Sequence, residues 1–192
     1  YYGSNTQQKK WLPRFATGDD VISICITEPD SGSHILGMNT IAQRDGDDYV
    51  LNGLKCWIAN SHIATVHGVI ARTGEGSNGL SAFLVEKDRI GVRPGRANDN
   101  TGLRGFNLGE VIFENCRVPV RNRIGVEGMG LEIIQALNFY GRSLRRLDML
   151  DILRVGSLEL LEMVVKREHT VPFLYPESPE FQAIPEVFAT GY

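Results

Sequence analysis

The chain has 192 residues, of which 42% are hydrophobic and 22% charged, a composition typical of folded globular proteins rather than disordered ones. Its net charge of -3 gives no electrostatic attraction to nucleic acid or to an anionic membrane. No apolar run approaches the ~20 residues that span a bilayer. The three cysteines lie far apart, so we expect buried free thiols, which suit the cytoplasm or the mitochondrial matrix. The four histidines lack metal-ligand spacing, so no metal site is predicted.

The first part of the chain is predicted to hold a short helix and then a series of strands. The opening residues have no signal-peptide pattern and are interpreted as the middle of a longer chain. Residues 6–15 have a helical pattern, which Pro13, Gly18 and the Asp19-Asp20 pair should end. Short apolar or alternating runs then follow, separated by turn residues, and the predicted strands are residues 21–26, 40–44, 49–51, 55–58, 66–72, 80–86 and 109–114.

Two turns are predicted among these strands. Asp45-Gly46-Asp47-Asp48 is typical of a hairpin turn, and Asn52-Gly53 is interpreted as a second turn. Strands at this regular spacing, without helices between them, favour a β-sandwich or β-barrel.

The hydrophobic period becomes helical after Gly128. Apolar residues recur at three- and four-residue steps from Met129 to about Arg167, and the prolines from Pro172 onward end the pattern. Residues 181–189 can begin another helix. The sequence therefore predicts an α+β protein, with a β-domain of about one hundred residues followed by long helices.

Residues 74–79 spell GxGxxG after a predicted strand, which is the pattern of a dinucleotide-binding loop. That loop must open a helix, because the pyrophosphate sits on the helix N-terminus. Residues 80–85 read as a strand instead, so the segment is interpreted as a hairpin turn.

The segment Ile24-Cys25-Ile26-Thr27-Glu28-Pro29-Asp30-Ser31-Gly32-Ser33 is the most informative stretch. It is predicted to be a strand end followed by a loop. Such a loop can direct several backbone N–H groups and hydroxyls at one anion, although a plain surface turn fits the same residues.

The order of these residues resembles the middle-domain signature of the acyl-CoA dehydrogenase family. Six further pieces match that family in order, at residues 3–13, 49–60, 81–86, 102–105, 115–119 and 125–130, and the resemblance extends to Arg142. It implies a middle β-barrel or sandwich domain followed by an incomplete C-terminal helical bundle. The implied domains are residues 1–20 (tail of an N-terminal helical domain), 21–124 (middle domain) and 125–192 (incomplete C-terminal domain).

The resemblance implies that FAD is the cofactor, with Thr27 at the flavin ring edge, Gly32 and Ser33 at the pyrophosphate, and Trp57 against the ring. The implied cofactor-binding residues are Ile24, Cys25, Ile26, Thr27, Gly32, Ser33, Trp57, Ile58, Ala59 and Arg167. The implied substrate-binding residues are Ser33, Phe139, Tyr140 and Arg142, since a permanently charged arginine suits a CoA moiety.

The family activity implied for the chain is α,β-dehydrogenation of an acyl thioester, carried by CoA or by an acyl-carrier protein, with hydride passing to FAD N5. Electron-transferring flavoprotein would be the partner, and the protein would be a homodimer or homotetramer. A flavin monooxygenase or nitroalkane-oxidase type of enzyme, or a non-catalytic relative, remain alternatives because fold does not fix function.

The chain departs from the family pattern at several positions. Ala59 replaces a Ser or Thr whose hydroxyl bonds the flavin, and His34 replaces an Asp, for which a structural role is expected. Gly141 stands where some members carry the catalytic glutamate, so no base is assigned within this chain. After Arg142 the match decays, and the 192 residues alone are expected not to turn over substrate.

Overall fold

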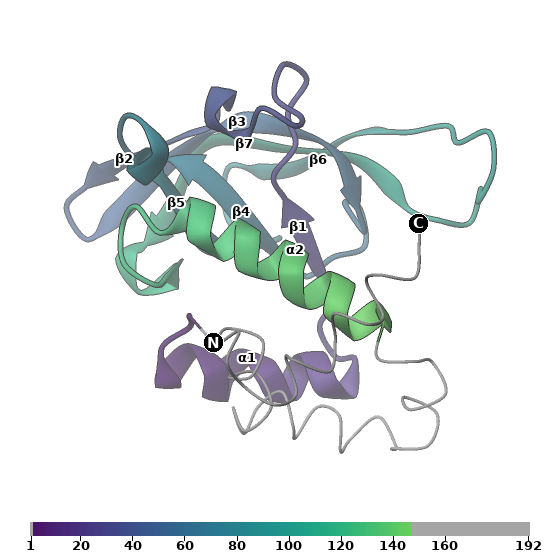
Figure 1. The fold of residues 1–192 in the computed structure, drawn as a ribbon, viewed down its shortest axis with the longest axis horizontal. Helices are drawn as coiled ribbons and strands as arrows, with labels where there is room; N and C mark the ends of the chain where they lie inside the picture. The colour runs from purple at the N-terminus through teal and green to yellow at the C-terminus, as the bar shows by residue number, and fades with distance from the viewer. Residues whose placement is uncertain (1, 147–192) are drawn as a thin grey trace, which may run out of the picture. The chain divides into compact units, whose positions relative to one another are not determined.

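The computed structural model describes residues 2–146, with side chains described for residues 2–138. Residues 2–139 form one unit, which is built on a curled β-sheet with the helix α1 and the first part of the helix α2 (Figure 1). The strands are β1 (Ile22–Cys25), β2 (Ile41–Asp45), β3 (Asp48–Ala59), β4 (Val66–Arg72), β5 (Leu80–Glu86), β6 (Val92–Ala97), β7 (Leu108–Pro119) and β8 (Arg123–Ile124). The helices are α1 (Asn5–Thr17) and α2 (Gly130–Arg146), with short 3₁₀ helices η1 (Ile35–Gly37), η2 (Ser77–Gly79) and η3 (Val120–Asn122). No helix in residues 2–146 is long and apolar enough to cross a membrane.

The helix α1 confirms the first predicted helix and its predicted end at Gly18, which caps it in the left-handed conformation. Ser4 caps it by accepting the Gln7 N–H at 3.2 Å, while the Gln7 side chain accepts the Ser4 N–H at 2.8 Å. The prediction that Pro13 ends the helix is wrong, because Pro13 lies inside it. Trp11 and Phe15, on either side of the proline, stack at 6.0 Å and pack on the sheet, so tertiary contacts outweigh the lost backbone bond.

The strand order is β6-β7-β3-β2-β4-β5-β8, with β1 alongside β4. The predicted hairpin at residues 45–48 is confirmed, since Asp45 pairs with Asp48 across a two-residue loop in which Gly46 has a φ of 60°. The second predicted turn, Asn52-Gly53, is wrong because β3 runs straight through it. The pairing register shifts at this point because β7, the strand opposite, contains one extra residue in a β-bulge. The Asn52 side chain accepts the N–H of Asn115 in that bulge at 2.7 Å.

The strand β6 was not predicted from the sequence, because Pro94 and Gly95 interrupt its pattern. Its position explains why they are tolerated: β6 is at the edge of the sheet and pairs only with β7 in the described strand order. A proline on an edge strand leaves no central ladder bond unmade.

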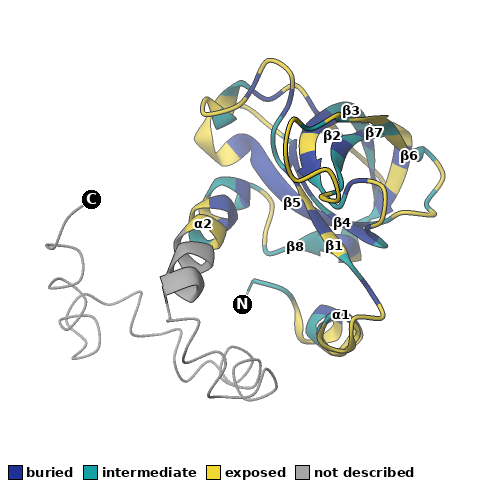
Figure 2. Ribbon diagram, turned by 90° about the vertical axis from the view of Figure 1, so that its right-hand side faces the viewer, coloured by how far each residue is buried: buried dark blue, intermediate teal, exposed yellow. Residues whose placement is uncertain are grey.

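The core has two layers, which explains why β4 and β5 read as continuous apolar runs. One layer fills the inside of the curled sheet, where Tyr49 and Phe83 meet edge-to-face at 5.0 Å. The other lies between the outer face of β4 and β5 and the helices, with Ile70 and Ile134 among its members. Figure 2 shows β4 and β5 as largely buried strands, whereas exposed residues lie on the loops, on α1 and on β6. Both faces of these strands are covered, so no alternation is visible.

The start of α2 approaches β5 closely. The Ser81 hydroxyl accepts the Gly128 N–H at 2.9 Å, and a Cβ on Gly130 would lie 2.6 Å from the backbone carbon of Leu80. Glycine at these positions therefore permits the contact. The predicted helical stretch beyond residue 146 lies outside the described residues.

Candidate functional site

The signature segment lies where two strands share one edge of β4. The strand β1 runs parallel to the first half of β4, and Ile41 at the start of β2 pairs with Arg72 at its far end. The loop of residues 26–40, called the signature loop below, joins these two strands. It can be followed in Figure 1 as the purple segment after β1. Because the strands on both sides of the loop pair with β4, the position of the loop is restrained, and its residues can hold a ligand in a fixed place.

A buried ion pair anchors this loop to β3. Lys55 Nζ lies 2.8 Å from Glu28 Oε1, and the two side chains are 0% and 3% exposed. Lys55 also donates to the Ile26 carbonyl oxygen at 2.9 Å. Glu28 accepts the Thr40 N–H at 2.9 Å and the Asn39 N–H, so its carboxylate ties the start of the loop to its end.

The protonation of this pair follows from its surroundings. Burial acts to raise the pKa of Glu28, but the hydrogen bonds from Lys55, Thr40 and Asn39 outweigh it, and the pKa lies below its ordinary value. Burial lowers the pKa of Lys55, while Glu28 acts in the opposite direction. The pair is therefore an ammonium and a carboxylate that satisfy each other inside the fold.

Trp57 is directed outward by a β-bulge in β3. Lys55 pairs with Val111 and Ile58 with Gly109, so three steps on β3 oppose two on β7. Trp57 has a φ of 58° and its side chain is 63% exposed. A bulky residue with left-handed backbone is uncommon and costs about 1–2 kcal/mol, and bulges that redirect a side chain are frequent beside active sites.

Trp57 and the signature loop are neighbours. The backbone N–H of Cys56 donates to the carbonyl oxygen of Thr27 at 2.9 Å, which places Trp57 one residue from the loop. Within residues 2–146, neither the Thr27 nor the Ser33 hydroxyl makes a side-chain hydrogen bond. These two hydroxyls are half-buried and exposed, respectively, and both can serve a ligand.

Gly32 has no structural reason to be glycine within the described part of the chain. Its φ is not positive, and no heavy atom lies within 4 Å of the position that a Cβ would occupy. Glycine is also used where a ligand approaches the backbone closely. The open space at Gly32 therefore fits the approach of a phosphate group to the loop.

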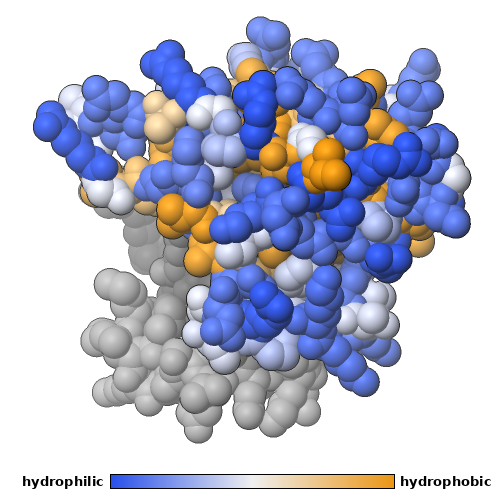
Figure 3. Space-filling view, turned by 180° about the vertical axis from the view of Figure 1, so that it is seen from behind, coloured by the Kyte–Doolittle hydropathy of each residue, from blue (hydrophilic) through white to orange (hydrophobic). Residues whose placement is uncertain are grey.

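The exposure of Trp57 is not by itself enough to identify a binding site. Figure 3 shows hydrophobic side chains in small separate groups on a largely hydrophilic face, which is normal for a folded protein. Ile90 and Leu103 are 91% and 83% exposed, more than Trp57. The combination of exposure, bulge and contact with the loop distinguishes Trp57.

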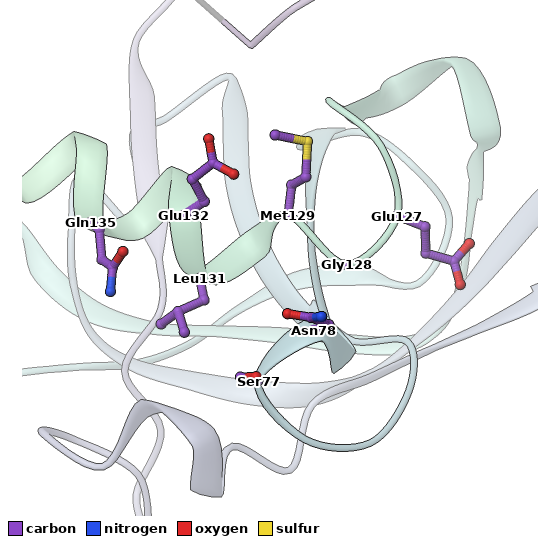
Figure 4. A pocket seen from close by; sticks show the side chains of 8 residues that line it. All are labelled: Ser77, Asn78, Glu127, Gly128, Met129, Leu131, Glu132 and Gln135. Atoms are coloured by element: carbon purple, nitrogen blue, oxygen red, sulfur yellow. The ribbon is translucent and has the colours of Figure 1, made fainter. Parts of the chain in front are cut away.

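A pocket lies at the start of α2, away from the residues discussed above. It is an open pocket of about 370 Å³ between the β4–β5 loop and the first turns of the helix, shown in Figure 4. Leu131 and Gln135 point from α2 toward Ser77 and Asn78, whereas Glu132 points away. The residues 74–79 confirm the predicted hairpin turn, since β5 rather than a helix follows them.

The sequence-predicted cofactor residues differ in what they expose. Cys25 and Ile58 are 0% and 2% exposed and belong to the inner core, so only their backbones can reach a ligand. Ile24 is 42% exposed, and Ile26 and Ala59 are half-buried. The backbones of Phe139, Tyr140 and Arg142 lie in α2, but their side chains, and all of Arg167, lie outside the described residues.

Three further residues in this region, His34, Glu28 and Lys55, were given no binding role from the sequence. The His34 ring lies beside its own loop, since a Cβ on Gly37 would lie 2.6 Å from it, and the structural role expected for His34 stays a prediction. The Glu28–Lys55 pair was not anticipated. A lysine between apolar residues on a strand is a usable signal, because buried lysines are paired with acids.

Comparison with known proteins gives three kinds of match. The family model described as acyl-CoA dehydrogenase, middle domain, matches residues 23–116. Mitochondrial isovaleryl-CoA dehydrogenase from Pongo abelii is 36% identical over 177 residues, which cover 90% of this chain and 40% of that enzyme. This chain therefore spans about two fifths of that relative's length.

Two solved structures resemble the chain equally well in shape. The prolyl acyl carrier protein oxidase AnaB is 38% identical with a TM-score of 0.68, over 69% of this chain and 36% of AnaB. PigA, solved as an FAD complex, is 35% identical with a TM-score of 0.68, over 71% of this chain and 37% of PigA.

Proposed function

The chain belongs to the acyl-CoA dehydrogenase family, and on that premise we propose that it supplies the FAD-binding middle part of an enzyme that desaturates acyl thioesters. The observation that carries the proposal is the backbone hydrogen bond from Cys56, the residue before Trp57, to Thr27 of the loop that also contains Gly32 and Ser33. An exposed indole, two hydroxyls available to a ligand and an open glycine match what a flavin with its pyrophosphate requires. The FAD complex of PigA supports this choice of cofactor.

Each residue has a defined role in the proposal. Trp57 packs on the planar ring, because its rigid indole is already directed away from the core. Thr27 donates a hydrogen bond to the polar edge of the ring, and Ser33 with the Gly32 backbone binds phosphate oxygens. Ile24, Ile26 and Ala59 line the approach to the ring, and Cys25 and Ile58 contribute backbone only. Arg167, Phe139, Tyr140 and Arg142 remain proposed contacts of the cofactor and the substrate.

Bound FAD supplies the hydride acceptor in this chemistry. The residues described here hold and orient it, and they exclude water from one side of the ring. None of them is proposed as the base that removes the α-proton of the thioester. The site residues Thr27, Ser33 and Trp57 are not carboxylates, and Glu28 is buried and paired with Lys55.

The substrate is proposed to be an acyl-CoA, in line with isovaleryl-CoA dehydrogenase, the relative named above. Electron-transferring flavoprotein as acceptor, a homodimer or homotetramer, and a matrix location are further proposals that rest on membership of the family. A carrier-bound acyl group is the second candidate, and the likeness to the carrier-protein oxidase AnaB favours it.

The test uses the full-length protein, purified with its flavin and kept anaerobic. A panel of acyl-CoA thioesters is added while the visible flavin absorbance is followed. Bleaching by one class of thioester is the expected result, and it identifies the substrate. A bound flavin that bleaches only with acyl-carrier-protein thioesters favours the second candidate. Rapid reaction of the reduced flavin with oxygen favours a monooxygenase, and a protein that takes up no flavin contradicts the proposal.

A further inference from the structure

We propose that Glu28 and Lys55 are positioning residues for the flavin. They fix where the signature loop lies relative to Trp57, and so determine how the flavin ring fits between the loop and Trp57. The inference deepens the proposed function and rests on it. Neither residue is exposed enough to touch a ligand, so the pair acts through its neighbours.

The pair sits between the residues that it is proposed to place. Glu28 directly follows Thr27, and Lys55 precedes Trp57 by two residues. The Lys55 ammonium contacts the loop twice, at the Ile26 carbonyl oxygen and at Glu28 Oε1. A shift in this pair therefore moves Thr27 relative to Trp57.

The same carboxylate also fixes the other end of the loop. Its two oxygens accept the N–H groups of Asn39 and Thr40, eleven and twelve residues along the chain. Between these points lie the exposed residues Gly32 and Ser33. One carboxylate thus closes the loop from Glu28 to Thr40 at its base while its tip stays open.

The choice of a charged pair rather than two apolar residues indicates that Glu28 and Lys55 serve to orient the loop more than to stabilise the fold. A buried ion pair contributes little net stability compared with a well-packed apolar pair, because both charges lose their hydration. It does impose directed bonds: Lys55 donates to two oxygens, and Glu28 accepts three hydrogen bonds. Apolar side chains would fill the same space without fixing the loop to these points.

A second set of contacts restrains the loop from the β4 side. Arg72 donates to the carbonyl oxygens of Met38, at 3.3 Å, and Leu36. Met38 is also buried against Lys55, with its Sδ 3.8 Å from Nζ. Arg72 therefore also holds the later half of the loop, and removal of the pair is expected to disturb mainly the part that carries Thr27.

The test compares the full-length wild type with the double variant Glu28→Gln/Lys55→Met, which removes both charges without leaving one unpaired. FAD affinity is measured by titrating the flavin-free protein, and the visible circular dichroism of the bound flavin reports the ring's surroundings. The double variant is expected to fold, to bind FAD at least about tenfold more weakly, and to show an altered flavin spectrum, a loss comparable to one or two hydrogen bonds.

Glu86→Gln is the matched control. Glu86 pairs with Arg89 at 2.7 Å and Lys10 at 3.2 Å and is partly buried, but it lies at the end of β5, outside the loop and β3. Its loss is expected to lower the melting temperature while leaving FAD affinity and the flavin spectrum unchanged. A purely structural role for Glu28 and Lys55 would give the same pattern as this control.

The outcomes separate the two proposals. A wild type that binds no FAD overturns the proposed function and this inference with it. A folded double variant with wild-type FAD affinity and spectrum overturns the inference alone. Should the double variant fail to fold, Glu28→Asp decides by the same two measurements, since it keeps both charges while its shorter side chain draws the carboxylate back from its partners in the loop.

Discussion

At the scale of single residues, Trp57 has a backbone conformation that its bulky side chain disfavours. Its backbone lies in the left-handed region, which an L-residue with a bulky side chain adopts only at a cost. Its side chain gains little from the fold in return, because most of it is exposed. Backbone strain of this kind persists where it serves a function, and here it directs the indole away from the core.

We predict that Trp57→Gly separates stability from ligand binding. Glycine removes the left-handed cost, so the free energy of unfolding should stay within about 1 kcal/mol of the wild type or rise. FAD affinity should fall at least about tenfold, because the aromatic contact is lost. Chemical denaturation and FAD titration measure the two quantities.

Asn115→Gly is the control for this prediction. Asn115 also has a positive φ, of 49°, but it faces Asn52 on a different stretch of β3. The Asn115→Gly variant should leave FAD affinity unchanged. Equal FAD affinity in the Trp57 variant and the wild type would contradict the assignment of Trp57.

At the scale of elements, the docking of α2 on β5 depends on backbone contact. Gly130 is the first residue of α2, and the atoms nearest to a Cβ built on it are backbone atoms of Leu80 and Ser81, at 2.6–2.8 Å. Backbone cannot move aside as a flexible side chain can. The glycine is thus required by packing rather than by its φ.

We predict that Gly130→Ala destabilises the protein by about 1–3 kcal/mol, the usual cost of overpacking. Intrinsic helix propensity predicts the opposite sign, since alanine stabilises a helix interior by about 1 kcal/mol relative to glycine. Urea unfolding distinguishes the two. Gly102→Ala, where an added Cβ meets nothing within 4 Å, should change stability by less than about 0.5 kcal/mol. A more stable Gly130 variant would show that the helix can move away from β5.

At the scale of the whole molecule, stability in acid depends on a histidine inside the curled sheet. His67 is 2% exposed and its Nδ1 lies 2.7 Å from the Ser23 hydroxyl. Burial lowers the pKa of His67 to about 4, with a smaller contribution from Lys87. The unfolded chain binds this proton at a pH near 6.5 and the folded chain only near pH 4, so acid favours unfolding between these values.

We predict that the free energy of unfolding falls by about 3 kcal/mol between pH 6.5 and pH 4 through this group. Glu28, whose pKa is lowered by its hydrogen bonds, adds a loss of the same sign at lower pH. His67→Gln keeps a polar partner for Ser23 and cannot be protonated, so its stability should depend less on pH in this interval. Denaturant midpoints at several pH values test this, and parallel curves for the two proteins would contradict it.

The sequence by itself determined the family, the succession of a β-domain and a helix, the hairpin at Gly46 and the residues of the signature loop. These features depend on local patterns: turn residues, apolar runs and an ordered motif. The sequence also predicted that the cysteines are buried, and Cys25, Cys56 and Cys116 are all buried in the structure. The domain limits and the site assignments derived from the family resemblance remain predictions.

The tertiary structure decided what depends on neighbours distant in the chain. Pro13 stays within α1 because Trp11 and Phe15 pack on the sheet, and β6 carries Pro94 because it lies at an edge. The outward direction of Trp57 comes from a mismatch in pairing between β3 and β7, which neither strand reveals alone. The Glu28–Lys55 pair joins residues 27 positions apart, and only the packing of the loop after β1 against β3 makes two buried charges compatible with a stable core.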